Sequence, residues 1–480
     1  MSSTITNLIW KFGERISSQL VSFVVSIIIA RILSPSDYGL IAMVTVFISI
    51  SYVLVDGGFS SALIQKKNTD RLDFSTVFYF SLLGAFVIYG ILFLGAPYIA
   101  DFYGEQYQQL TPLLRVLGLL VIIYSINSVQ AAYISRKMMF RRFFWATMTG
   151  TSASAVVGIY LAYYGYGVWA LVGQQLTASI VNTITLFLIT RKLPGLEFSL
   201  VRLKSFFSYG VRLLGANILS NIFLDFRTFV IAKLYSADQL AFFDRGRQYP
   251  YLVVNNINSS IAAVLFPRMS HLQDDAISIK KMTRDSIRFS SFLMCPLMLG
   301  LAAVAEPLVR LLLTEKWIHC VPFLQLFCII YLFQPIHTAN MQAIKALGRS
   351  DVYLNLELIK KTIEILMLLI VMWISVEAIA INMAVLTTLF TFVNAYPNTK
   401  LLNYSLKEQL QDILPALGMS LGVFVIAYFI TYLPLDDIIM LIAQIVVGVI
   451  VYTSLSILTK NKEYKCMCNI VRNKLNMWQK

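Results

Sequence analysis

The chain has 480 residues, of which 58% are hydrophobic and only 13% are charged. A soluble protein of this length carries roughly twice that share of charged residues, and the mean hydropathy is +0.71. Apolar runs of about 20 residues, the length that crosses a bilayer, recur along the whole chain. The composition therefore excludes a soluble protein and predicts a polytopic helical membrane protein.

The first twenty residues contain Glu14 and Arg15 and no small-residue cleavage pattern, so we expect an amphipathic entry helix and not a removable signal peptide. The lengths of the apolar runs and the helix-breaking residues between them predict fourteen spans joined by short links. The spans are expected near residues 14–33, 38–57, 75–97, 110–135, 144–164, 167–190, 207–234, 248–268, 287–313, 320–345, 352–374, 377–397, 412–433 and 438–458.

The distribution of basic residues orients these spans. If the links from odd to even spans lie outside, most of the 39 lysines and arginines fall in cytoplasmic segments. The positive-inside rule then places both termini in the cytoplasm. The same asymmetry accounts for most of the net charge of +14, so no nucleic-acid partner is expected.

The chain also carries an internal repeat. At a constant offset of 210 residues, identical residues meet in four pairs: Pro97 with Pro307, Glu105 with Glu315, Pro112 with Pro322, and Leu114 with Leu324. At an offset of 202, Gly13 meets Gly215 and Ser34 meets Ser236. Chance matching of biased apolar sequence is the alternative.

Six spans separate the copies, so both have the same orientation, and a site is expected between the halves. This predicts an N-lobe at 1–195, a C-lobe at 196–400, and two extra spans with a basic tail at 401–480. Two lobes without a large extramembrane domain favour transport over catalysis.

Three short segments carry a family resemblance: LSPSDYG after span 1, DGGFSSALIQ at the end of span 2, and the charged loop before FSTVF. With these, residues 30–83 resemble the polysaccharide transporter family of the MOP flippase superfamily. The similarity is greatest to Wzx-type members linked to colanic acid, amylovoran or teichuronic acid export. LYSADQLAFFDRGRQ and FPRMSHLQDD are similar to the family too.

The resemblance implies a MATE-like fold and a flippase of the bacterial inner membrane. Its substrate would be an undecaprenyl-diphosphate-linked oligosaccharide repeat unit, moved by alternating access through a cavity lined by helices 1, 2, 7 and 8. It implies neither an enzyme nor a cofactor. The partners would be the bilayer, the lipid-linked substrate, and a polymerase or chain-length regulator. A cation-coupled multidrug antiporter and a membrane-embedded enzyme of glycan assembly are the alternatives.

Span 7 carries charged and polar residues where ions are costly. Asn217, Asn221 and Asp225 recur every four residues and form one stripe. Arg227 lies two positions from Asp225, on another side of the helix. We expect Asp225 either to pair with an arginine of span 1 or 8 or to bind a proton.

Span 8 has a second polar row, formed by Gln248, Asn255, Asn258 and Ser259. Uncharged donors and acceptors suit sugar hydroxyls, and hydrogen bonding between helices is the alternative.

A diphosphate group instead requires guanidinium or ammonium groups. The main candidates are Arg15 and Arg212, at the cytoplasmic starts of spans 1 and 7, and Arg227. Further candidates are Arg115, for which a structural role is the alternative, and, near the outer mouth, Arg31, Arg245 and Arg247. Anchoring at the membrane surface is the alternative for Arg15 and Arg212.

Two polar features are predicted to be local. In span 11, Glu357 with Lys361 and Lys360 with Glu364 have the spacing of helical ion pairs, and an interface role is expected. His337 in span 10 is expected to be satisfied by nearby groups, facing Asn340. The five scattered cysteines are interpreted as incidental free thiols.

Overall fold

The structure is a computed structural model that describes residues 2–66, 69–190, 195 and 197–478. Within these ranges, the side chains at 2–9, 11–12, 208–213, 216–224, 470–471 and 473–478 lie outside the description. The described residues form helices joined by short turns. Ten of the described helical segments are long and apolar enough to cross a membrane, which confirms the prediction of an all-α polytopic membrane protein.

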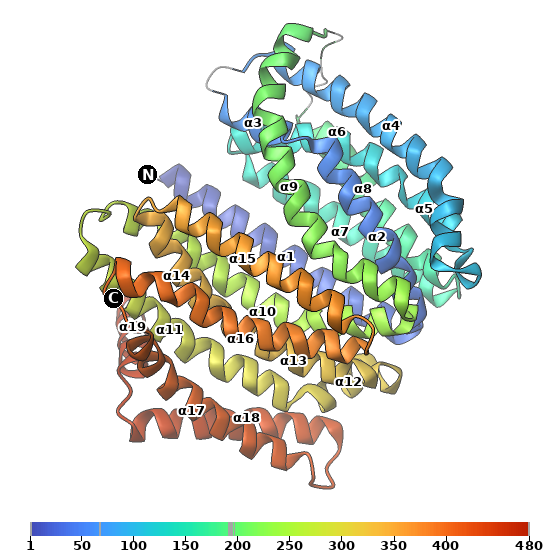
Figure 1. Cartoon of the computed structure of the whole chain (residues 1–480). Helices are drawn as coiled ribbons and strands as arrows, with labels where there is room; N and C mark the ends of the chain where they lie inside the picture. The colour runs from blue at the N-terminus through green and yellow to red at the C-terminus, as the bar shows by residue number, and fades with distance from the viewer. Residues whose placement is uncertain (1, 67–68, 191–194, 196, 479–480) are drawn as a thin grey trace. The chain divides into compact units, whose positions relative to one another are not determined.

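The chain divides into two compact units, residues 1–241 and 242–480. In the first unit, α9 packs against α2, α3 and α4, while α7 packs between α1 and α8 (Figure 1). Its elements are α1 (Ser2–Ile32), α2 (Pro35–Asp56), α3 (Phe59–Gln65), α4 (Arg71–Tyr103), η1 (Glu105–Tyr107), α5 (Leu110–Leu117), α6 (Leu119–Arg136), α7 (Phe140–Tyr163), α8 (Val168–Thr190) and α9 (Leu200–Leu234).

The second unit contains the rest of the chain, and α10 (Ala237–Ser270) begins in the first unit and ends in the second. Here α17 packs against both α11 and α18 (Figure 1). The other elements are α11 (Ala276–Ala303), α12 (Ala305–Leu313), η2 (Glu315–Cys320), α13 (Val321–Leu332), α14 (Gln334–Ala346), α15 (Ser350–Val371), α16 (Val376–Leu401), α17 (Leu406–Ile430), α18 (Asp437–Leu458) and α19 (Lys462–Trp478).

Four predicted spans fall on helices outside the group of ten. These are α7, α9, α10 and α15. They are helical over the expected ranges, but their described residues are not both long and apolar enough to count as membrane spans. The reason is visible in α15, where four charged residues lie between positions 357 and 364. Both the count of fourteen spans and the division into lobes therefore stay predictions.

The LSPSDYG segment forms the turn between α1 and α2. Ser34 is the N-cap of α2, and Pro35 occupies its first turn. The Ser34 hydroxyl accepts from the Asp37 N–H, while the Asp37 carboxylate accepts from the Ser34 N–H at 3.0 Å. This reciprocal pair satisfies two amide groups that the helix cannot pair internally.

Gly39 follows in the first turn of α2, where a side chain has no room. A Cβ atom there would lie 2.0 Å from the carbonyl oxygen of Ala237, which begins α10. The Tyr107 hydroxyl accepts from the Ala237 N–H at 3.2 Å. Glycine thus allows two backbone segments of the first unit to touch.

The two predicted repeat copies share local structure. Glu105 and Glu315 each begin a short 3-10 helix, and Pro112 and Pro322 each lie in the first turns of the helix that follows. Ser236 accepts from the Gln239 N–H at the start of α10, as Ser34 does at the start of α2. These likenesses favour a true duplication over chance matching.

All five cysteines are free. Cys295, Cys320 and Cys328 are buried in the second unit, while Cys466 and Cys468 are exposed on α19. Among the described residues, no cluster of three or more histidine, cysteine or acidic side chains has the arrangement of a metal site.

Candidate functional site

Asp225 lies on α9 and is half-buried. The Ser49 hydroxyl, on α2, donates to Asp225 Oδ2 at 2.5 Å. Ser49 was not among the partners expected from the sequence, because no pattern within α9 points to α2. The carboxylate is thus held by a neutral donor from a neighbouring helix of the same unit, which suits an ion enclosed within a membrane protein.

The predicted arginines lie at different places in the first unit. Arg15 on α1 and Arg227 on α9 are both half-buried. The side chains of Arg212, Asn217 and Asn221 lie outside the described residues, so the expected polar stripe on α9 stays a prediction.

The α10 row is half-buried in the second unit, and two of its members make local contacts. Gln248 Oε1 accepts from Arg245 at 2.7 Å, and the Ser259 hydroxyl donates to the backbone carbonyl of Asn256 at 3.2 Å. Asn258 Oδ1 is buried and has no hydrogen-bond partner among the residues that the structure describes. Asn255, also half-buried, completes the row.

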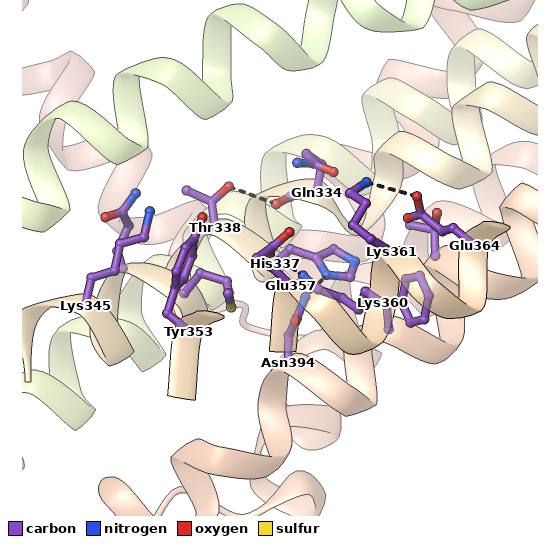
Figure 2. Close-up of a pocket in the computed structure, with 14 residues that line it drawn as sticks. Gln334, His337, Thr338, Lys345, Tyr353, Glu357, Lys360, Lys361, Glu364 and Asn394 are labelled. Carbon is purple, nitrogen blue, oxygen red and sulfur yellow. Dashed lines mark hydrogen bonds and ion pairs between the residues drawn. The ribbon is translucent and has the colours of Figure 1, made fainter. Parts of the chain in front are cut away.

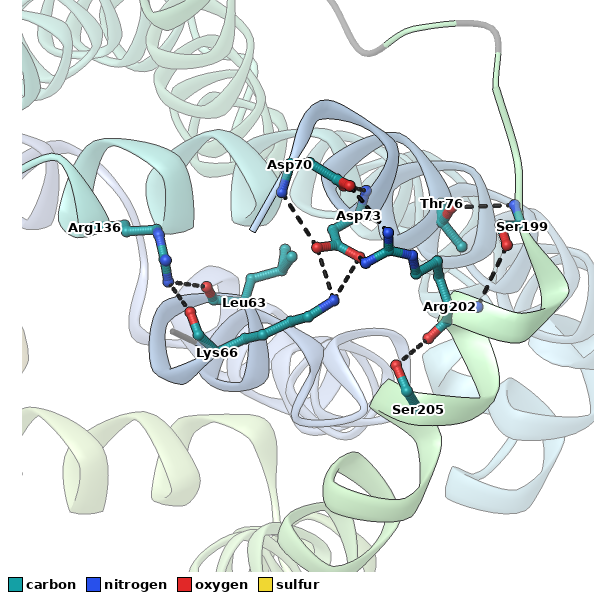
Figure 3. Close-up of polar contacts among 9 residues, drawn as sticks. All are labelled: Leu63, Lys66, Asp70, Asp73, Thr76, Arg136, Ser199, Arg202 and Ser205. Carbon is teal, nitrogen blue, oxygen red and sulfur yellow. Dashed lines mark hydrogen bonds and ion pairs between the residues drawn. The ribbon is translucent and has the colours of Figure 1, made fainter. Parts of the chain in front are cut away.

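A charged cluster lies where the end of α3, the start of α4 and the start of α9 meet (Figure 3). Asp73, whose side chain is 0% exposed, lies 2.7 Å from Lys66 Nζ and 3.4 Å from Arg202 Nη1. Arg202 also reaches Asp70 at 3.1 Å. Asp70 and Asp73 form a reciprocal cap at the start of α4. We call these four residues the Asp73 cluster.

Further contacts join the same region to the α8–α9 link. The Ser75 hydroxyl accepts from the Gly195 N–H at 2.7 Å, and Thr76 accepts from the Ser199 N–H at 3.2 Å. Arg136, from α6, donates to the carbonyls of Leu63 and Ile64 near the C-terminus of α3, each at 3.0 Å. Positive charge there matches the negative end of a helix.

The second unit contains a cavity of about 330 Å³ between α14, α15 and α16 (Figure 2). From α14, the lining residues are Gln334, His337, Thr338, Met341, Gln342 and Lys345. From α15, they are Tyr353, Glu357, Lys360, Lys361 and Glu364. From α16, they are Thr387, Phe390 and Asn394. We call this space the α14–α16 cavity.

The ion pairs of α15 differ from those expected. Lys360 lies 2.6 Å from Glu357, and Lys361 lies 2.9 Å from Glu364. The pairing is local, but three residues separate the partners, whereas four were expected. Both spacings place side chains on the same helix face. All four side chains line the α14–α16 cavity, and the expected interface role stays a prediction.

His337 is satisfied by nearby groups, as expected, but its partners are not those predicted. Asn394 Nδ2 lies 2.6 Å from His337 Nδ1, and Thr391 Oγ1 lies 3.2 Å from Nε2. With Asn394 donating, Nδ1 accepts and Nε2 donates to Thr391, whose own hydroxyl donates to the Thr387 carbonyl. Asn340 instead contacts Gln409 and Asn398.

The sequence did contain a signal for the α14–α16 cavity. On α14, the lining positions fall at 334, 337/338, 341/342 and 345, and on α15 at 353, 357, 360/361 and 364. Both series have the three-to-four-residue spacing of one helix face. Each face is polar within a helix that would otherwise be apolar, a combination that indicates a wet surface inside a membrane protein.

Apolar helices of membrane length, with ionised side chains and a polar cavity enclosed among them, define a polytopic membrane protein. Solved structures share its fold. Lipid II flippase MurJ in an inward closed conformation superposes with a TM-score of 0.75 at 15% identity, covering 94% of this chain and 99% of that one. A MATE family multidrug resistance transporter of the MOP superfamily gives 0.64 at 15% identity, covering 81% and 96%.

The chain belongs to the family described as polysaccharide biosynthesis protein, which matches residues 28–322. The succinoglycan biosynthesis transport protein ExoT of Rhizobium meliloti is 23% identical over 98% of this chain and 96% of its own length. The lipopolysaccharide biosynthesis protein WzxC of Escherichia coli is 23% identical over 69% of this chain and 68% of its own. These matches confirm the resemblance to Wzx-type polysaccharide transporters.

Proposed function

We propose that this protein is a flippase that moves an undecaprenyl-diphosphate-linked oligosaccharide repeat unit across the bacterial inner membrane. The exported unit would serve exopolysaccharide, capsule or O-antigen synthesis. The observation that carries the proposal is the similarity to a transport protein of polysaccharide synthesis over 98% of the chain. The fold shared with a lipid II flippase supports it.

In this proposal all fourteen predicted spans cross the membrane, in two six-helix lobes plus two C-terminal helices, and both termini lie in the cytoplasm. Alternating access between the lobes moves the substrate. The chain performs no catalysis and uses no cofactor. A polymerase and a chain-length regulator act beside it.

The site residues predicted from the sequence keep their proposed roles. Arg15, Arg212 and Arg227 bind the diphosphate, because planar guanidinium groups match phosphate oxygens. The uncharged polar residues contact the sugars: Asn217, Asn221, Gln248, Asn255, Asn258 and Ser259. Asp225 lines the same site and either pairs with an arginine or binds a proton. The contact of Asp225 with Ser49 supports an enclosed polar setting for this part of α9.

Deletion of the gene in its own host tests the function. We expect the lipid-linked repeat unit to accumulate on the cytoplasmic face and polymer export to stop. Reintroduction of the wild-type chain should restore export. Normal export with reduced drug tolerance would favour a multidrug antiporter instead, and transferase activity of the purified chain on labelled lipid-linked sugar would favour an enzyme.

A local test compares Arg227→Lys with Arg227→Ala in the deletion strain. Lysine keeps the charge but loses the fork of donors, so partial export is expected, whereas alanine should abolish it. The matched control is Arg115→Ala, whose guanidinium stacks 4.4 Å from the Phe93 ring centroid in the same unit. Full export by the Arg227→Ala chain at normal abundance would remove Arg227 from the site.

A further inference from the structure

The α14–α16 cavity holds an unusual combination of charges for a small space in a membrane protein. Three lysines and two glutamates line it, together with amide and hydroxyl groups. One member of each ion pair is 33% exposed, and ion pairs that water can reach add little to stability. Charged residues that line a space and add little stability point to a ligand.

The lysines of the cavity differ in their partners. Lys360 is paired with Glu357 at 2.6 Å, and Lys361 with Glu364 at 2.9 Å. Lys345 has no carboxylate within ion-pair distance among the described residues, and its ammonium lies 4.1 Å from the Tyr353 ring centroid. The cavity lining therefore carries one net positive charge, and the charge not matched by a carboxylate is that of Lys345.

The uncharged lining groups both donate and accept. The side-chain amides of Gln334 and Gln342 can do both, and the carboxylates of Glu357 and Glu364 accept. At the base of the cavity, Asn394 Oδ1 is buried without a hydrogen-bond partner among the residues that the structure describes. Hydroxyl groups, which donate and accept, match such a lining better than a purely anionic ligand does.

We propose that the α14–α16 cavity binds one acidic sugar of the transported repeat unit, with Lys345 taking the sugar carboxylate and the glutamates and amides taking its hydroxyls. This inference rests on the proposed function and deepens it by naming a class of substrate. A volume of about 330 Å³ lies at the lower end of the range for small-ligand pockets, roughly 300–1,000 Å³. It suits a single sugar and not a whole repeat unit.

A diphosphate fits the same cavity poorly. It would need at least two cations without acidic partners, and Lys360 and Lys361 already have theirs. It would also bring its negative charge close to Glu357 and Glu364. A carboxylate brings a single charge, and Lys345 exchanges only a cation–π contact for a stronger charge-assisted hydrogen bond.

Binding of small probes to the purified full-length chain in detergent tests the proposal, with saturation-transfer NMR as the measurement. The probes are D-glucuronate, D-glucose, acetate and inorganic pyrophosphate. Glucuronate and glucose differ only at C6, so they isolate the carboxylate. We expect glucuronate to bind and both glucose and acetate to bind at least about tenfold more weakly, because each lacks one part of the recognised group.

Variants locate the binding. Lys345→Gln should weaken glucuronate binding by about tenfold or more, while Lys345→Arg should keep most of it. The control is Arg349→Gln, because Arg349 is exposed, is paired with Asp351 at 2.8 Å and does not line the cavity. A thermal unfolding midpoint for each variant shows whether the chain is folded. If Lys345→Gln does not fold, glucuronate binding by the Lys345→Arg chain is measured instead.

Four results would each overturn the proposal: no measurable glucuronate binding, equal binding of glucose or acetate, tighter binding of pyrophosphate that depends on Lys345, or glucuronate binding unaffected by Lys345→Gln. The gene deletion separates this failure from failure of the proposed function. If deletion stops export but glucuronate does not bind, only the acidic-sugar site is wrong. If export continues without the gene, the proposed function is wrong whatever binds to the cavity.

Discussion

Asp73 in the first unit and Lys360 in the second are both charged residues with little solvent exposure, but their surroundings differ. The Asp73 side chain is fully enclosed by cations and capping groups at the start of α4. Lys360 borders a cavity in which its pair with Glu357 leaves room for a ligand. The enclosed Asp73 cluster stabilises the packing of helices, whereas the charged residues that line the α14–α16 cavity are available to a ligand.

The largest effect is expected from Asp73→Ala. Removal of the carboxylate breaks both ion pairs and the reciprocal cap of α4, and losing a cap together with charge-assisted hydrogen bonds costs about 3 kcal/mol. The thermal unfolding midpoint of the purified chain should fall clearly. Asp70→Asn is the matched control, because asparagine also caps a helix and the partly exposed pair of Asp70 with Arg202 contributes less than about 1 kcal/mol. An unchanged unfolding midpoint for Asp73→Ala would show that the Asp73 cluster does not stabilise the packing of these helices.

Arg136→Met should give the next largest loss. The substitution keeps the apolar stem but removes the guanidinium that donates to the carbonyls near the end of α3. Charge-assisted hydrogen bonds of this kind contribute about 2 kcal/mol. Arg141→Met serves as the control, since the Arg141 guanidinium lies over the Trp10 ring. Equal losses in the two variants would show that the capping contacts are unimportant.

Lys360→Met tests the charged lining of the α14–α16 cavity in the same way. Glu357 is one-third exposed, so water can solvate it after the loss of its partner, and we expect a cost of only about 1 kcal/mol. Adding Glu357→Gln should recover part of that cost. Export in the deletion strain should fall more than abundance does. A stability loss as large as that of Asp73→Ala would show that the charged residues of the cavity also serve mainly to stabilise helix packing.

The smallest effect concerns pH. The Asp73 N–H donates to Asp70, and the charges of Arg202 and Lys66 lie nearby, so the pKa of the Asp70 carboxyl is lowered. The group stays ionised to a lower pH in the folded chain than in the unfolded chain. Its stabilisation is therefore complete well above about pH 4 and is lost as the pH falls through the lowered pKa.

Asp70→Asn should accordingly flatten the fall of the unfolding midpoint below about pH 4, with little change at neutral pH beyond the loss of the exposed ion pair. Unfolding curves of wild type and variant, measured across the acid range, check this. Parallel curves would show that Asp70 contributes nothing to the acid dependence.

Much of the fold was predictable because its signals are local. Apolar length located ten helical segments that are long enough to cross a membrane, and the LSPSDYG turn is formed by Ser34 and Asp37, which are three residues apart. Contacts between distant helices were not predictable in this way. Ser49 and Asp225 are 176 positions apart, and nothing in either helix specifies the other. The same holds for Asp73 and Arg202, which are brought together only by the packing of α9 against α4.

The site residues predicted on α1, α9 and α10 stay predictions, and the α14–α16 cavity was missed for a physical reason. The sequence of α15 offered a complete local explanation, because each lysine has a glutamate within one helical turn. Local pairing and cavity lining are compatible, and only the positions of α14 and α16 distinguish them. The polar faces of three helices, considered together, would have indicated the cavity.

The distribution of cysteines gives the natural chain a built-in label. Three thiols are buried, and the two exposed ones both lie on α19, so a membrane-impermeant maleimide should modify the tail and leave the helical body unmodified. Added to intact spheroplasts, the reagent should label the chain only after permeabilisation if α19 faces the cytoplasm. Labelling of intact cells would instead place α19 outside. The sidedness of the C-terminus can thus be measured without introducing a single substitution.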